Sequence, residues 1–112
     1  MGAIIKIEES KLSEIVKCLV DTYQPRRVYL FGSRSRGEAG PDSDYDLLLV
    51  VPDNASPERR RSKLAYDCLW GKGVAVDVLV WTEGKFSRRS SVITSLPATV
   101  IREGSLLYDA QS

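Results

Sequence analysis

The feature that most constrains this fold is a continuous apolar run, Leu47–Val51, which directly follows a polar stretch at residues 42–46. A strand exposed on one face alternates apolar and polar side chains. An unbroken apolar run instead indicates a strand that is buried on both faces. Such a strand needs other elements of the chain packed around it, so the flanking sequence must supply them.

The flanking sequence supplies helices and strands in alternation. Apolar residues recur at helical spacing from Leu12 to Tyr23, and short runs of β-branched and aromatic residues recur between glycine- or proline-containing turns. Alternation of this kind predicts a single α/β domain over residues 1–112, with helices packed on a small mixed sheet of three or four strands. The expected helices span residues 10–23, 56–70, 82–95 and 98–102, and the expected strands span residues 27–31, 44–51, 74–81 and 105–108.

The composition narrows the possible chemistry. The 112 residues include no histidine, which excludes Ser-His-Asp triads and HExxH zinc sites. Sixteen basic residues against fifteen acidic ones give a net charge of +1, so nucleic-acid or membrane binding is not expected. No apolar run is long enough for a membrane helix, and no signal-peptide pattern is present. We therefore expect a cytoplasmic protein in which Cys18 and Cys68 are buried, free thiols.

A phosphate-binding turn is predicted where the strand at residues 27–31 ends. Gly32 and Ser33 follow this strand, and Arg34 and Arg36 come directly after them. Glycine permits close backbone approach, and free N–H groups at the start of a short helix can hold phosphate oxygens. The arginines would add charge-assisted hydrogen bonds. The alternative interpretation is an ordinary turn with a helix cap.

Asp44 and Asp46 stand where the long apolar strand begins. Side chains alternate along a strand, so both carboxylates project from one face while Tyr45 points to the other. Two carboxylates on one face suit a cation such as Mg²⁺. A solvated turn is the alternative, but the apolar run places Asp46 at the edge of a buried strand.

Asp77 is the single acid within the apolar run at residues 74–81. An unpaired buried charge is costly, so this carboxylate needs an ion-pair partner, an exposed strand edge or a metal. If its strand lies beside the preceding one, Asp77 can meet Asp44 and Asp46 at one cation site. Three such acids beside a phosphate-binding turn fit metal-dependent phosphoryl or nucleotidyl transfer, in which Asp77 orients or deprotonates the attacking hydroxyl.

These residues together resemble a known family. The string Phe31-Gly-Ser-Arg-Ser-Arg-Gly37, then Ser43-Asp-Tyr-Asp-Leu47, and later Asp77 resemble the nucleotidyltransferase superfamily of DNA polymerase beta. The small stand-alone branch, the minimal nucleotidyltransferases, is the most similar, and the segment Ile101–Tyr108 resembles the end of those proteins. The similarity spans residues 28–108.

The resemblance implies a nucleotidyltransferase fold, a residue-level site and a partner. Gly32 and Ser33 would bind the triphosphate, Asp44 and Asp46 would ligate one or two Mg²⁺ ions, and Asp77 would be the third catalytic acid. ATP would donate AMP to a hydroxyl, a tyrosine of a HEPN toxin, and the chain would act as an antitoxin. Two alternatives stay open: a non-catalytic antitoxin that covers a HEPN ribonuclease, and one subunit of a two-chain enzyme that modifies a small molecule or RNA.

Two further groups of residues carry weaker signals. Arg59–Arg61 with Lys63 is interpreted as a solvated helix face or, alternatively, as a contact for an acidic partner. The aromatic residues Trp70, Trp81 and Phe86 are interpreted as a partner-binding patch or as core, with core favoured for Trp81.

Overall fold

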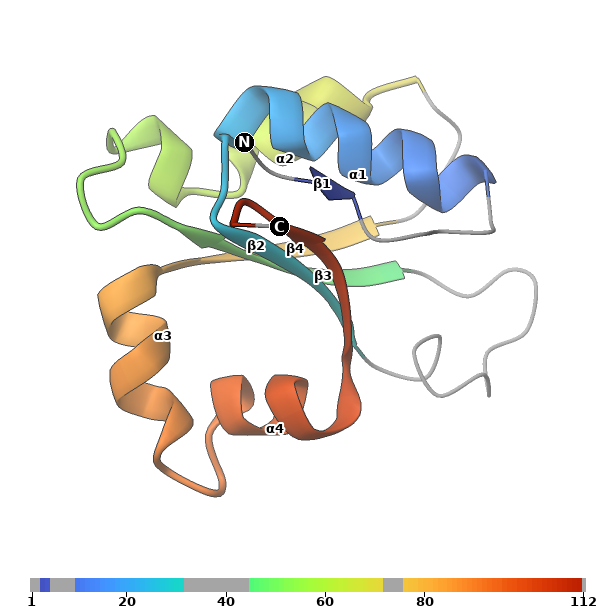
Figure 1. Cartoon of the computed structure of the whole chain (residues 1–112). Coiled ribbons are helices and arrows are strands. Elements are labelled where there is room, and N and C mark those ends of the chain that lie inside the picture. The colour runs from blue at the N-terminus through green and yellow to red at the C-terminus, as the bar shows by residue number, and fades with distance from the viewer. Residues whose placement is uncertain (1–2, 5–9, 32–44, 72–75, 112) are drawn as a thin grey trace.

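The computed structural model describes residues 3–4, 10–31, 45–71 and 76–111 of the chain (Figure 1). Its elements alternate as the sequence predicts. The strands are β1 (Ala3–Ile4), β2 (Arg27–Phe31), β3 (Tyr45–Val51), β4 (Val76–Thr82) and β5 (Ser105–Asp109). The helices are α1 (Ser10–Tyr23), the 3₁₀ turn η1 (Glu58–Arg60), α2 (Lys63–Leu69), α3 (Glu83–Ser90) and α4 (Leu96–Glu103).

Within the described residues, the strands form one mixed sheet in the order β1-β5-β2-β3-β4. β3 pairs antiparallel with β2 and parallel with β4, and β5 pairs antiparallel with both β2 and β1. The four longer strands confirm the predicted small mixed sheet, and the two-residue β1 extends it at one edge. β4 forms the opposite edge.

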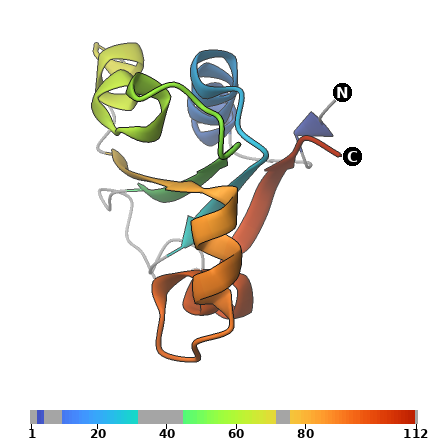
Figure 2. The same ribbon diagram turned by 90° about the vertical axis from the view of Figure 1, so that its left-hand side faces the viewer.

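The sheet is the middle layer of three. α1 and α2 lie on one face, and α3 and α4 lie on the other (Figures 1 and 2). β3 accordingly contributes to two cores. Leu47, Leu49 and Val51 pack in the α1 and α2 core, whereas Leu48 and Val50 pack in the α3 and α4 core. All five side chains have no solvent exposure, which accounts for the unbroken apolar run.

The buried phenol of Tyr23 links the end of α1 to the segment before α2 through hydrogen bonds. The Tyr23 hydroxyl donates a hydrogen bond to the Arg61 carbonyl oxygen at 2.5 Å and accepts one from the Ala65 N–H at 2.9 Å. Removal from solvent raises the pKa of the Tyr23 phenol above its ordinary value. The Arg59 Nε in turn donates to the Tyr23 carbonyl oxygen at 2.9 Å. These bonds tie the end of α1 to the segment that leads into α2.

This network explains why the helix expected over residues 56–70 is wrong in its first half. The chain forms only the short turn η1, becomes extended at Arg61, and starts α2 at Lys63. The N-cap of η1 is Pro57, which makes no side-chain cap hydrogen bond, and not the predicted Ser56. The bond from Tyr23 to the Arg61 carbonyl holds the chain out of a helical path at this point.

The two C-terminal helices also differ from their expected limits. The helix expected to reach residue 95 ends at Ser90, and Ser95 instead caps the next helix by accepting a hydrogen bond from the Ala98 N–H at 3.3 Å. α4 is therefore longer than the single turn expected, and it ends before Gly104 as predicted. The Gly104 backbone packs closely on β2, because a Cβ there would lie 2.8 Å from the Leu30 carbonyl oxygen.

Candidate active site

The parallel pairing of β3 with β4 brings two of the predicted acids side by side. Asp46 and Asp77 are direct partners in the strand register. Adjacent strands lie about 4.8 Å apart, and paired residues of neighbouring strands project their side chains from the same face. The structure therefore meets the condition set by the sequence, namely that the strand of Asp77 lies beside the strand of Asp46.

The acid pair lies on the α3 and α4 face at the end of the sheet where β3 and β4 begin. Asp46 alternates with the buried Leu48 of the second core, whereas Tyr45 packs in the first core with 4% exposure. The prediction that Tyr45 points away from the acids is thus confirmed. Asp77 is exposed and Asp46 is half-buried, so the pair is open to a ligand.

The remaining predicted site residues lie outside the described part of the chain; they are Gly32, Ser33, Arg34, Arg36 and Asp44. Phe31 is the last described residue before this segment, and it pairs with Asp46 in the register of β2 and β3. The predicted phosphate-binding turn therefore follows directly in sequence from the neighbour of an acid. Its role and that of Asp44 stay predictions.

The acids fit a hard cation by chemistry. Carboxylate oxygens are the ligands that Mg²⁺ prefers, and two of them from adjacent strands can share an ion. Within the described residues, no three Asp, Glu or Cys side chains gather closely enough to form a metal site. The predicted set reaches three only with Asp44, which is not among them.

Sequence reasoning overlooked Leu79, which neighbours the acid pair. Leu79 lies two residues after Asp77 on the same face of β4 and is 40% exposed. Next in the row comes Trp81, whose ring lies 5.0 Å from the Lys85 ammonium group. The alternation of residues 77, 79 and 81 in the sequence would have shown that the three share a face, but not that Leu79 is exposed.

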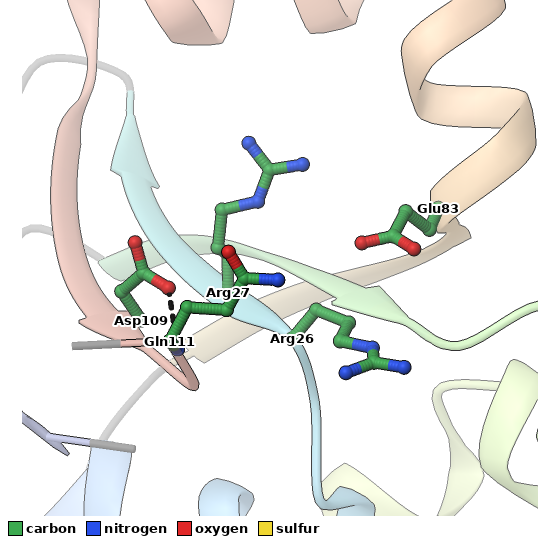
Figure 3. A pocket seen from close by; sticks show the side chains of 5 residues that line it. All are labelled: Arg26, Arg27, Glu83, Asp109 and Gln111. Carbon is green, nitrogen blue, oxygen red and sulfur yellow. Dashed lines mark hydrogen bonds between the residues drawn. The ribbon is translucent and has the colours of Figure 1, made fainter. Parts of the chain in front are cut away.

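A hollow lies at the end of the sheet opposite the acid pair (Figure 3). It is lined by residues from the start of β2, the start of α3 and the end of β5; these are Arg26, Arg27, Glu83, Asp109 and Gln111. The Arg27 guanidinium extends toward α3, where it lies 5.4 Å from the Phe86 ring, whereas Arg26 extends to the other side. Because the two guanidinium groups do not converge, this hollow is a poor match for a triphosphate.

The other residues singled out in the sequence have varied surroundings. Phe86 is buried and stacks on Tyr29 at 5.6 Å between ring centroids, so it belongs to the core and not to a patch. Trp70 is 88% exposed. Arg59 is half-buried against the end of α1, which corrects its interpretation as a solvated residue.

Cys18 and Cys68 are free thiols as predicted, although they are only partly buried. The Cys18 Sγ donates a hydrogen bond to the Cys68 carbonyl oxygen at 3.2 Å. Among the described helices, none is both long and apolar enough to cross a membrane.

The structure thus combines a mixed sheet between two helical layers with paired acids where two adjacent strands begin, an α/β arrangement compatible with nucleotide transfer. The sequence profile of the Nucleotidyltransferase domain family matches residues 11–101. The chain belongs to this family and is a nucleotidyltransferase.

Comparison with individual proteins agrees with this assignment. A protein of Methanocaldococcus jannaschii, named as a candidate protein adenylyltransferase, is 30% identical over 103 residues, covering 90% of this chain and 98% of that protein. A chain in a crystal structure of a toxin–antitoxin complex with AMP-PNP is 25% identical with a TM-score of 0.63, over 92% of this chain and 76% of that one.

The fold recurs at lower identity. A chain in the structure of a tri-AMPylated Shewanella oneidensis HEPN toxin in complex with an MNT antitoxin has a TM-score of 0.54 at 21% identity. The match covers 90% of this chain and 71% of that one. This likeness shows the shared nucleotidyltransferase fold, which confirms the predicted fold class.

Proposed function

We propose that this chain transfers AMP from ATP to a tyrosine hydroxyl of a HEPN toxin and thereby acts as its antitoxin in the cytoplasm. The observation that carries the proposal is the register pairing of Asp46 with Asp77 in a nucleotidyltransferase. Similarity to a candidate protein adenylyltransferase and to a chain of a toxin–antitoxin complex with AMP-PNP supports the donor and the kind of partner.

The proposed step is a displacement at the α-phosphorus of ATP. The acceptor oxygen forms a bond to this phosphorus, the bond to the bridging oxygen of the β-phosphate breaks, and pyrophosphate leaves with the electron pair. Asp77 orients the acceptor hydroxyl and takes its proton. Gly32, Ser33, Arg34 and Arg36 hold the triphosphate, as the sequence predicts.

Asp44, Asp46 and Asp77 would hold Mg²⁺, and the pairing of Asp46 with Asp77 fits that role. Mg²⁺ at these carboxylates would neutralise negative charge on the triphosphate and on the pyrophosphate that leaves. The protein itself supplies the position of Asp46, whose strand β3 is buried on both faces at residues 47–51.

The test follows label from ATP into protein. The chain is incubated with Mg²⁺, ATP labelled at the α-phosphate, and the product of the neighbouring gene, which we expect to be a HEPN protein. We expect label on the HEPN protein, none from ATP labelled at the γ-phosphate, and a loss of about 100-fold or more in rate for Asp77→Asn. Asp67→Asn, an equal loss of charge on exposed α2, is the matched control and should transfer at the wild-type rate.

The second candidate is a non-catalytic antitoxin that only covers its partner. It is favoured by the exposed aromatic residues on and just after α2, where Tyr66 is 49% and Trp70 is 88% exposed. If Asp46→Ala combined with Asp77→Ala neutralises toxicity as well as the wild type, catalysis is dispensable and this candidate replaces the first. A neighbouring gene that encodes no HEPN protein would instead favour a two-chain enzyme.

A further inference from the structure

One side of β4 carries a row of three different side chains. Asp77, Leu79 and Trp81 alternate on the α3 and α4 face, opposite Asp46, Leu48 and Val50 of β3. Leu48 has no exposure, whereas its register partner Leu79 is 40% exposed. A single exposed leucine is ordinary on a protein surface. This one differs because it directly follows an active-site acid on the same face of the strand.

Leu79 lies on an edge strand whose α3 and α4 face is covered incompletely. α3 starts directly after β4 and buries Phe86 against Tyr29 of β2. α4 lies against β2, where Gly104 permits close approach to Leu30. α3 contacts β4 and β3, α4 contacts β2, and β4 is an edge strand that pairs on one side only among the described residues. The apolar surface of Leu79 is left beside the acids.

The nearest aromatic residue in this row, Trp81, already contacts Lys85. Trp81 is partly buried, and the Lys85 ammonium group lies 5.0 Å from the centroid of its ring. A cation in this position favours the ring face electrostatically. Leu79 is therefore the accessible apolar surface that lies between the acid pair and the Trp81–Lys85 contact.

We infer that Leu79 supports the ring of an aromatic acceptor and so selects a phenol over an aliphatic hydroxyl. The inference rests on the proposed function and adds a residue that sets acceptor specificity at the same site. Alternate residues of a strand are about 7 Å apart, a span comparable to the length of a tyrosine side chain. An acceptor hydroxyl at Asp77 thus places a tyrosine ring over Leu79, which a serine or threonine side chain is too short to contact.

Leu79 acts in this scheme through contact with the acceptor and takes no part in bond making. A ring that covers a leucine removes apolar surface from water, which favours the phenol in the bound state. Discrimination by small changes in apolar contact is about ten-fold or more in enzymes. We therefore expect Leu79 to govern the KM for the acceptor more than kcat.

The experiment first identifies the acceptor residue and then changes Leu79, the residue inferred to contact it. The residue of the HEPN protein that gains AMP is mapped by mass spectrometry, and transfer kinetics are measured for Leu79→Thr and Leu79→Met. Leu79→Thr keeps a strand-forming side chain but removes apolar surface, and Leu79→Met keeps that surface. Ile101→Thr, at 51% exposure on α4, is the matched control.

We expect a modified tyrosine, a KM for the HEPN protein about ten-fold higher in Leu79→Thr, and near-wild-type values in Leu79→Met and Ile101→Thr. Unchanged melting temperatures would show that each variant is folded. A KM in Leu79→Thr equal to that of the control would overturn the inference alone, whereas a modified serine or threonine would overturn the proposed tyrosine acceptor as well. Transfer that needs Asp77 but not Leu79 overturns the inference alone, whereas absence of any transfer by the wild-type chain overturns the proposed function with it.

Discussion

Replacing Asp77 by asparagine tests the cation site through stability, independently of catalysis. Asparagine keeps the size of the side chain and removes its charge. Asp46 and Asp77 are register partners, so their side chains project from the same face of strands that lie about 5 Å apart. At that distance two like charges in a mostly aqueous environment repel by about 1 kcal/mol. Asp77 is exposed, so the repulsion should stay close to this value for charges in water.

Without a divalent cation, Asp77→Asn should therefore stabilise the fold by about 1 kcal/mol, a rise of roughly 4 °C in melting temperature for a chain of this length. With Mg²⁺ at ten times its Kd, the wild-type chain should gain about 1.4 kcal/mol. The variant lacks one of the carboxylates and should gain less than half as much. The higher stability of the variant should therefore disappear or reverse when Mg²⁺ is added.

The assay is thermal unfolding followed by circular dichroism, with and without Mg²⁺. Asp67→Asn serves as the control, since Asp67 is exposed on α2 and pairs only with Lys63 at 3.3 Å among the contacts seen there. This control should change stability by less than about 0.5 kcal/mol and keep the full response to Mg²⁺. Equal Mg²⁺ responses in the wild type and Asp77→Asn would refute the cation site at this acid pair.

The remaining predictions concern the packing of the helices against the sheet. Tyr23→Phe leaves the Ala65 N–H and a backbone carbonyl without their side-chain partner and should cost about 2 kcal/mol in urea unfolding, against less than about 0.5 for the exposed Tyr66→Phe. Because burial raises the pKa of Tyr23, wild-type stability should fall as pH rises above about 10, and Tyr23→Phe should remove that part of the slope. Gly104→Ala would place a Cβ 2.8 Å from the Leu30 carbonyl oxygen and should destabilise the fold by about 2 kcal/mol, whereas a loss below 0.5 would contradict the close packing.

The parts of the fold that were predictable depend on side-chain periodicity. The helical spacing that ends at Tyr23 and the strand runs that include Leu48 and Asp77 are local patterns, and each matches an observed element. The pairing of Asp46 with Asp77 followed from one further condition, that consecutive apolar strands are neighbours. Periodicity supplies such information because each face of an element meets a different environment.

The parts that were not predictable depend on contacts between distant residues. Ser56 and Pro57 carry ordinary signals for a helix start, but the bond from Tyr23 to the Arg61 carbonyl interrupts the helix. Ser95 was expected to end a helix and instead begins one. The exposure of Leu79 depends on where α3 and α4 settle over the sheet, which its own neighbours in sequence do not determine.

The parallel arrangement of β3 and β4 also bears on how the protein reaches its native state. Parallel neighbours cannot be joined by a tight turn, so η1 and α2 must cross over before the two strands can align. Closing such a long loop costs chain entropy before any pairing compensates for it, and contacts of this kind form slowly. We therefore expect Asp46 and Asp77 to meet late in folding, so that an activity that depends on the proposed acid pair would report the last steps of chain assembly.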